Sequence, residues 1–215
     1  MSAPKDGMLD MSTNSLRVHA FVRPALARAL VICALAFTLG SCRGLPFPEP
    51  TLDGPYGQAL RRETRTGAQY SHLETRAFVR MVRLTPELVD LAAAMVAERR
   101  GEGPALAKAR RDAWIAELDA PTFIAVVHTP EASWNDWDSA KSVWTIVMVD
   151  GETQAKPEKV TRLEKPFTPE QQALYPYLDD FAQGYRIRFP PGTKGQRIQA
   201  AGVLGKLDFD WSVPE

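Results

Sequence analysis

Apolar positions follow a helical period in the middle of the chain. Between residues 85 and 119 they recur every three or four positions, which predicts two helices that begin at Pro86 and Pro104. Thr85 precedes the first helix as a capping residue, and Gly101 ends it. In the second helix we expect one apolar stripe, formed by Leu106, Ala109, Ala113 and Leu118.

After Pro121 the period of the apolar residues changes to two, which is typical of strands. Residues 122–129 and 143–150 are apolar on both faces, as central strands are. An earlier strand is expected over 76–84, where arginines suit a sheet edge. Shorter strands are expected over 159–163, 185–189, 198–200 and 207–213, with a short helix over 169–174.

The last two strands carry their apolar residues at opposite parities. Ile198 and Ala200 are even-numbered, whereas Leu207, Phe209 and Trp211 are odd-numbered. A slip of one residue exchanges the two faces of a strand, so a turn or bulge is expected within residues 202–205.

Six or seven short strands surround the two helices, so the sequence predicts a mainly β fold with an α insertion. The architecture that fits is an immunoglobulin-like β-sandwich with two helices, about 85–119, inserted after the first strand. The alternative is an α+β domain in which a single sheet packs on helices.

Composition narrows the class of protein. Of the 215 residues, 45% are hydrophobic and 24% are charged, which excludes wholesale disorder and a polytopic membrane protein. The 26 basic and 26 acidic residues give a net charge of zero, and this argues against nucleic acid as a partner, because its phosphates require a basic surface.

The N-terminal region has the pattern of a secretory signal. Residues 29–40 form an uncharged apolar run that follows Arg17, Arg23 and Arg28. The run is shorter than the roughly 20 apolar residues that a spanning helix needs. Its end, Leu39-Gly40-Ser41-Cys42, resembles the lipobox of bacterial lipoproteins: an aliphatic residue, two small residues and a cysteine.

This resemblance implies that residues 1–41 are a signal peptide, whose true start is Met1, Met8 or Met11, and that Cys42 carries the lipid. Residues 42–74 are then expected to form a tether, rich in Pro and Gly over 43–58, and residues 75–215 the domain. Arg43 stands where aspartate signals inner-membrane retention, which favours the outer membrane within the cell envelope.

The layout of anchor, tether and β-rich domain is similar to that of uncharacterised immunoglobulin-like envelope lipoproteins. This resemblance carries over no functional residue except Cys42. Cys33 leaves with the signal peptide, so the expected mature domain has no cysteine for a disulfide or a thiolate metal site.

Residues that could perform catalysis are few. His128 ends a predicted central strand, and Ser133 and Asp136 follow in the next loop, but no sequence frame joins them as a triad. The chain has none of the usual metal or phosphate-binding motifs. We therefore expect no catalytic residue, no metal and no cofactor.

One loop is a candidate binding site. Trp134, Asn135, Asp136, Trp137 and Asp138 lie between the two predicted central strands. Exposed aromatic rings beside amides and carboxylates bind sugar faces or an apolar anchor of a protein partner. The competing interpretation is that the tryptophans fold back and cap the core.

Three classes of function follow. The leading hypothesis is a lipid-anchored, non-enzymatic envelope protein that acts as a protein-interaction or structural module on the periplasmic side or at the cell surface. Its partners would be the membrane, through the lipid on Cys42, and an envelope protein. The first alternative is binding of peptidoglycan or another glycan through Trp134 and Trp137. The second is an envelope hydrolase that uses His128.

Overall fold

The computed structural model describes residues 53–72 and 74–212, which form two antiparallel sheets and several helices. The elements are α2 (Gly54–Glu63), β1 (Thr64–Ser71), β2 (Glu74–Arg83), α3 (Pro86–Arg100), α4 (Pro104–Ala116), β3 (Thr122–His128), η1 (Ala132–Trp134), β4 (Trp144–Asp150), β5 (Thr153–Ala155), β6 (Lys159–Arg162), α5 (Pro169–Leu174), β7 (Gln183–Arg188), β8 (Arg197–Gly202) and β9 (Gly205–Asp210). The predicted signal peptide, Cys42 and the first part of the predicted tether, up to residue 52, lie outside these residues.

The strands divide between a five-stranded sheet and a four-stranded sheet. The first has the order β1-β2-β3-β7-β6 and the second the order β5-β4-β8-β9. The two predicted central strands, β3 and β4, do lie between neighbours, but they belong to different sheets. The mainly β prediction is therefore confirmed, whereas the single-sheet alternative is wrong.

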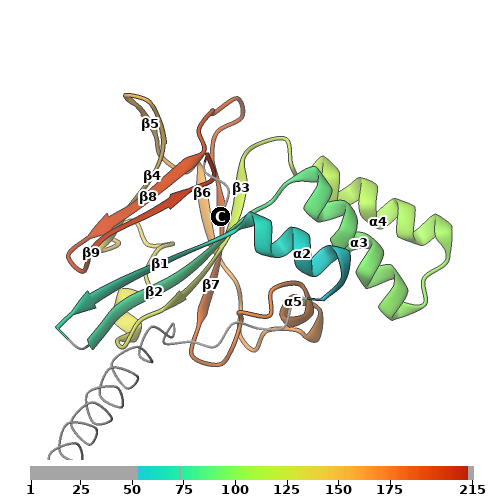
Figure 1. Cartoon of the computed structure of the whole chain (residues 1–215), viewed down its shortest axis with the longest axis horizontal. Coiled ribbons are helices and arrows are strands. Elements are labelled where there is room, and N and C mark those ends of the chain that lie inside the picture. Colours follow the sequence, from blue (N-terminus) through green and yellow to red (C-terminus); the bar gives the residue numbers. More distant parts are fainter. Residues whose placement is uncertain (1–52, 73, 213–215) are drawn as a thin grey trace, which may run out of the picture. The chain divides into compact units, whose positions relative to one another are not determined.

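Figure 1 shows how the strands of the two sheets are arranged. Side chains from both sheets form one apolar core. Val79, Ala125 and Ile187 contribute to it from the five-stranded sheet. Ile198 and Phe209 contribute from the four-stranded sheet and are fully buried. Because the inward side chains of each strand alternate with outward ones, this shared core fixes the register of both sheets.

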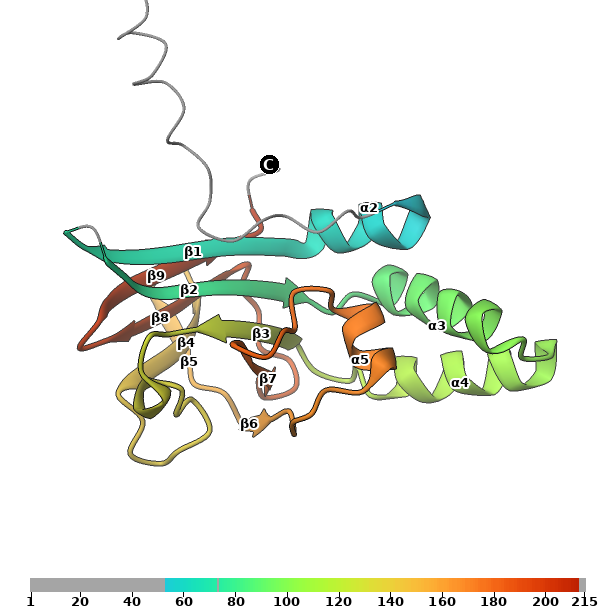
Figure 2. The same ribbon diagram turned by 90° about the horizontal axis from the view of Figure 1, so that it is seen from below.

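A second apolar cluster lies on the other face of the five-stranded sheet. Ile124 and Val126 of β3 pack there with residues of α2, α3 and α5. This explains why β3 is buried at every position: one face contacts the facing sheet and the other contacts the helices. The helices gather at one end of the strands, and α3 and α4 project from that end as a pair (Figure 2).

The predicted helix ends are confirmed. The Thr85 side chain accepts a hydrogen bond from the Leu88 amide at 3.2 Å, and Gly101 ends α3 in the left-handed conformation, with φ of 62°. Thr168 caps α5 through a reciprocal pair of hydrogen bonds with Gln171. These caps are local, so a short stretch of sequence is enough to specify them.

The predicted apolar stripe of α4 is not buried. No residue of α4 is buried, and Leu106 is 56% exposed. The reason is that α4 has α3 as its main neighbour and contributes no residue to the core between the two sheets, while Trp114 of α4 packs against the cluster on the helical side of the five-stranded sheet. Leu106, Ala109 and Ala113 of the predicted stripe are exposed, whereas Leu118 is half-buried.

The predicted domain boundary at residue 75 is also wrong. Residues 54–71, which the sequence analysis places in the tether, form α2 and β1. Tyr56, Ala59 and Leu60 are buried on one face of α2. Their spacing of three and four residues is typical of a helix, but the prolines and glycines of the segment indicated a tether instead. The α3–α4 insertion consequently follows the second strand, not the first.

The parity prediction at the C-terminal end is confirmed. β8 and β9 pair as a hairpin in which Gly202 lies opposite Gly205, and the turn between them brings both apolar sets inward. Ala200 and Leu207 are paired across this hairpin and are both buried. A β carbon on Gly202 would lie 2.2 Å from the Val143 carbonyl oxygen, so close strand packing requires glycine there.

Candidate functional site

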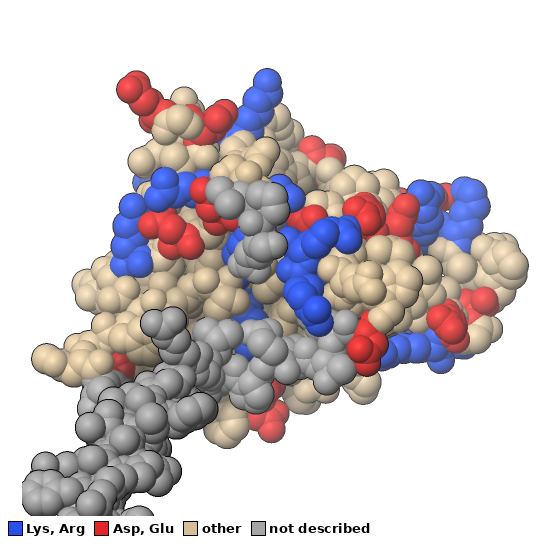
Figure 3. Space-filling view, viewed as in Figure 1, with Lys and Arg blue, Asp and Glu red and all other residues tan. Residues whose placement is uncertain are grey.

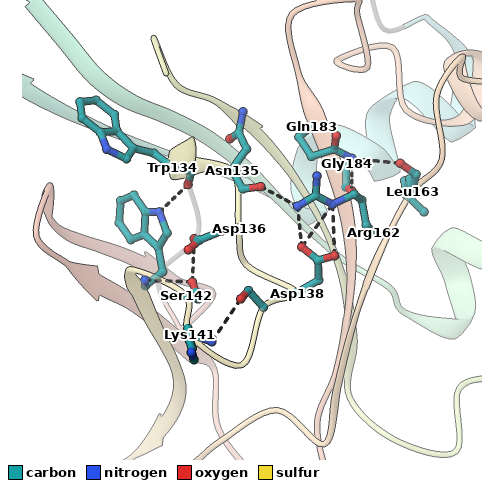
Figure 4. Close-up of polar contacts among 12 residues, drawn as sticks. Trp134, Asn135, Asp136, Asp138, Lys141, Ser142, Arg162, Leu163, Gln183 and Gly184 are labelled. Carbon is teal, nitrogen blue, oxygen red and sulfur yellow. Dashed lines mark hydrogen bonds and ion pairs between the residues drawn. The ribbon is translucent and has the colours of Figure 1, made fainter. Parts of the chain in front are cut away.

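The loop between β3 and β4 crosses from one sheet to the other and is held by its own side chains (Figure 4). Asp136 accepts a hydrogen bond from the Ser142 hydroxyl at 2.8 Å on one carboxylate oxygen and from the Val143 amide at 2.9 Å on the other. The Trp144 indole donates to the Trp134 carbonyl at 3.0 Å. The predicted site residue Asp136 therefore has a structural contact on each oxygen.

An ion pair joins this loop to β6. The Arg162 guanidinium donates to both carboxylate oxygens of Asp138, at 3.1 Å from Nε to Oδ2 and at 2.7 Å from Nη2 to Oδ1. The same Nη2 also donates to the Asn135 carbonyl at 2.7 Å. The hydrogen bond from Arg162 holds the pKa of Asp138 below its usual value, against the opposing effect of burial.

Trp137 does not belong to a surface site. Its side chain is 3% exposed, and it stacks on Tyr185 with 5.8 Å between ring centroids and 15° between the ring planes. It also contacts Trp144, with 5.8 Å between centroids. For this residue the prediction of a binding platform is wrong, because the ring fills the core between the two sheets.

The other predicted residues of the loop are more accessible. Trp134 is half-buried, and the Arg76 guanidinium lies over its ring at 5.9 Å from the centroid. Asn135 is half-buried and Asp138 is exposed. The structure thus brings all five predicted residues into one loop, but it does not present two aromatic rings to a ligand.

His128 contacts an acid from a distant part of the chain. Its Nε2 lies 3.1 Å from Asp179 Oδ2, and the histidine is 5% exposed. The other Asp179 oxygen accepts hydrogen bonds from the Phe181 and Ala182 amides, at 2.9 and 2.8 Å. Burial would raise the pKa of Asp179, but the hydrogen bonds from His128 and from these amides outweigh it and leave the pKa low.

This His128–Asp179 contact joins the end of β3 to the turn before β7. The catalytic alternative would also need the loop residues that follow His128. Asp136, however, bonds to Ser142 and Val143, and Ser133 is an exposed residue of η1. The contact therefore holds two segments together and is not accompanied by the triad that the alternative would use.

Sequence reasoning missed an exposed apolar surface on the helical pair. We define the α4 outer face as Ala105, Leu106, Ala109, Ala113 and Ala116, all of which are exposed. On a helical projection these five residues are contiguous over about 100° of the helix. The signal was present in the spacing of the apolar residues, but spacing alone does not tell which side of the helix meets the rest of the protein.

Charged residues flank this surface as paired groups. Arg111 of α4 contacts Asp90 of α3 at 2.7 Å, and Arg110 pairs with Glu102. Basic and acidic side chains are likewise interspersed on the face shown in Figure 3. The helical pair therefore combines balanced charges with an apolar stripe.

No three His, Cys, Asp or Glu side chains among residues 53–72 and 74–212 lie close enough together to hold a metal ion. In the same part of the chain, no helix has the length and apolar character needed to cross a membrane.

Comparison with known proteins finds no match to a protein-family model, to a curated protein or to a solved structure.

Proposed function

We propose that this chain is a lipid-anchored, non-enzymatic envelope protein whose domain binds a protein partner through the α4 outer face. The observation that carries the proposal is that α4 buries none of its residues while it presents an apolar stripe to solvent. Contiguous apolar surface of this kind is typical of protein-interaction sites. We also propose that the protein lies at the outer membrane and that its partner is an envelope protein.

The anchor is supported by the sequence around Cys42. The basic flank, the apolar run and Leu39-Gly40-Ser41-Cys42 occur in the order that lipoprotein processing requires. Mass spectrometry of the N-terminal peptide tests this step separately. We expect a peptide that begins at Cys42 and carries acyl chains, whereas an unmodified Cys42 within a longer peptide would contradict the anchor.

The docking surface is supported by the kind of side chain that forms it. Four alanines and Leu106 leave the α4 backbone accessible to close approach, so a partner helix can pack against it with its ridges in the α4 grooves. The α4 outer face can thus accept an apolar helix without rearrangement of the two sheets.

Paired charge substitutions test the docking surface. Ala109→Asp and Ala113→Asp together place two carboxylates within the proposed interface, and burial of each should weaken binding by about tenfold or more. The control is Gln58→Asp on α2, which makes a similar change at another exposed helical position. Each variant is crosslinked in its native membrane, and the partner that copurifies is quantified.

We expect the double variant to lose at least nine-tenths of a stoichiometric partner, while Gln58→Asp retains it. Equal recovery from both variants would contradict the use of α4. Circular dichroism of both proteins shows whether a loss arises from unfolding, which is not expected because both substituted alanines are exposed.

The finer assignment of the fold is part of the proposal. We propose that the two sheets form an immunoglobulin-like sandwich, which their shared core supports. The glycan-binding alternative has less support, because Trp137 is buried and only Trp134 has a partly accessible ring.

A further inference from the structure

A partly enclosed cavity of about 190 Å³ lies between the helices and the outer face of the five-stranded sheet. Its apolar lining includes Trp114 of α4, Ile124 of β3, Leu163, which follows β6, and Leu174 of α5. Four segments that are distant in sequence therefore meet around one space. This cavity is separate from the α4 outer face, since none of the five residues of that face lines it.

The size of the cavity limits what it can hold. Drug-sized ligands occupy pockets of roughly 300–1,000 Å³. A cavity of roughly 150 Å³ with a similar apolar lining binds benzene. The volume here, about 190 Å³, therefore fits one ring or a short branched chain with a small substituent, and it is too small for a lipid acyl chain.

Tyr175 and Gln171, two neutral residues that carry hydrogen-bond donors, line the same cavity. No described residue hydrogen-bonds to the Tyr175 hydroxyl, and burial raises the pKa of this tyrosine to about 12, so the group stays protonated at neutral pH. Gln171 accepts a hydrogen bond from the Thr168 amide through its side-chain oxygen at 2.8 Å, which leaves its NH2 group as a donor.

The charged groups of the lining are already paired. Arg186 Nη1 lies 2.8 Å from Glu117 Oε2, and both residues line the cavity. Because the two charges cancel, a charged ligand gains little attraction here and still loses its hydration. A ligand with a neutral acceptor loses less hydration and can use the donors of Tyr175 and Gln171.

We infer that this cavity binds a small neutral molecule with a ring-sized apolar body and one hydrogen-bond acceptor, such as a carbonyl oxygen. The apolar body lies against Trp114 and Ile124, and the acceptor oxygen takes a hydrogen bond from the Tyr175 hydroxyl. The volume of the cavity limits the size of the ligand, and the apolar lining favours an apolar ligand body. The neutral donors favour a ligand head group that accepts a hydrogen bond.

Methyl NMR of the full-length protein in detergent micelles tests this site. With isoleucine δ-methyl groups labelled, Ile124 reports from the cavity wall, while Ile146 and Ile198 report from the core between the sheets. Three probes of similar size are titrated: acetophenone, which has a ring and a carbonyl group; toluene, which has no acceptor; and benzoate, which is charged.

We expect acetophenone to shift the Ile124 resonance along a saturable curve and to leave Ile146 and Ile198 unchanged. Toluene and benzoate should each bind at least fivefold more weakly. Tyr175→Phe should weaken acetophenone about fivefold to tenfold, the effect of one lost hydrogen bond. The matched control, Tyr70→Phe, removes the same hydroxyl from an exposed tyrosine of β1 and should change nothing.

Ala92→Leu adds three carbons to the cavity wall and should abolish the saturable shift. The Ile146 and Ile198 resonances show whether this variant folds. If it does not, the comparison of Tyr175→Phe with Tyr70→Phe still tests the site. A non-saturable shift with acetophenone would overturn the site. Benzoate binding as tight as acetophenone binding, or a Tyr175→Phe variant with unchanged affinity, would overturn the assigned ligand class.

Discussion

Replacement of Trp137 by alanine distinguishes a core residue from a ligand-binding residue. The side chain is 97% removed from solvent, since its exposed fraction is 3%. A buried tryptophan removes roughly 150–250 Å² from water, and at about 25 cal/mol per Å² this corresponds to about 4–6 kcal/mol as an upper estimate. Measured Trp→Ala substitutions in cores lower the free energy of unfolding by about 3–5 kcal/mol, and we expect that range here.

Trp134→Ala is the matched control, because it makes the same substitution three residues earlier in the same loop. Trp134 is half-buried and packs under Arg76, so we expect its removal to lower the free energy of unfolding by about 1–2 kcal/mol. The assay is urea denaturation of residues 42–215 with Cys42 replaced by serine, followed by far-ultraviolet circular dichroism so that the signal does not depend on the tryptophans.

The placement of Trp137 in the core would be refuted if Trp137→Ala lowered the free energy of unfolding by less than about 1 kcal/mol. It would also be refuted if Trp137→Ala lowered the free energy of unfolding by less than Trp134→Ala does. The stacking of Trp137 on Tyr185 and its contact with Trp144 would then be wrong as well. A ring at the surface would restore the basis for glycan binding by this loop.

Three further predictions concern the caps, the His128–Asp179 contact and α4. Thr168→Ala should lower the free energy of unfolding by about 1 kcal/mol and the melting temperature by roughly 2–4 °C, measured calorimetrically, because α5 loses its reciprocal cap. Hydrogen bonds from His128 and two backbone amides hold the pKa of Asp179 below its ordinary value, so its contribution to stability is present at neutral pH and is lost as the pH falls through the folded pKa. In urea titrations at pH 6 and pH 3, Asp179→Asn should therefore lose less stability on acidification than the parent protein. Leu106→Ala should change the free energy of unfolding by less than about 0.5 kcal/mol, whereas Leu88→Ala, in the buried face of α3, should lower it by about 2–5 kcal/mol in the same denaturation assay.

Local features of the fold could be predicted from the sequence because their causes are local. The Thr85 and Thr168 caps, and the change of parity between β8 and β9, each depend on a few neighbouring residues. β1 was missed because its sequence is mostly polar, with Gly67 at its centre, and it lacks an alternating apolar signal. Its place in the sheet depends on pairing with β2, which is a tertiary effect.

The candidate site was harder to predict than the fold. The spacing of Trp134, Asp136 and Trp137 gave no indication of which ring enters the core, because that depends on Tyr185, which lies 48 residues after Trp137 in the chain. Arg162 carried no sequence signal at all, although it bonds to the loop through Asp138. Contacts between distant segments decided both cases.

Photocrosslinking in living cells tests most directly whether α4 is the docking surface. A photoreactive amino acid is placed at position 109 in the α4 outer face and, as the control, at position 203 in the β8–β9 turn, where Val203 is 80% exposed. We expect position 109 to yield one discrete adduct with an envelope protein that position 203 does not form. The same adducts from both positions, or none from position 109, would contradict the proposed interface.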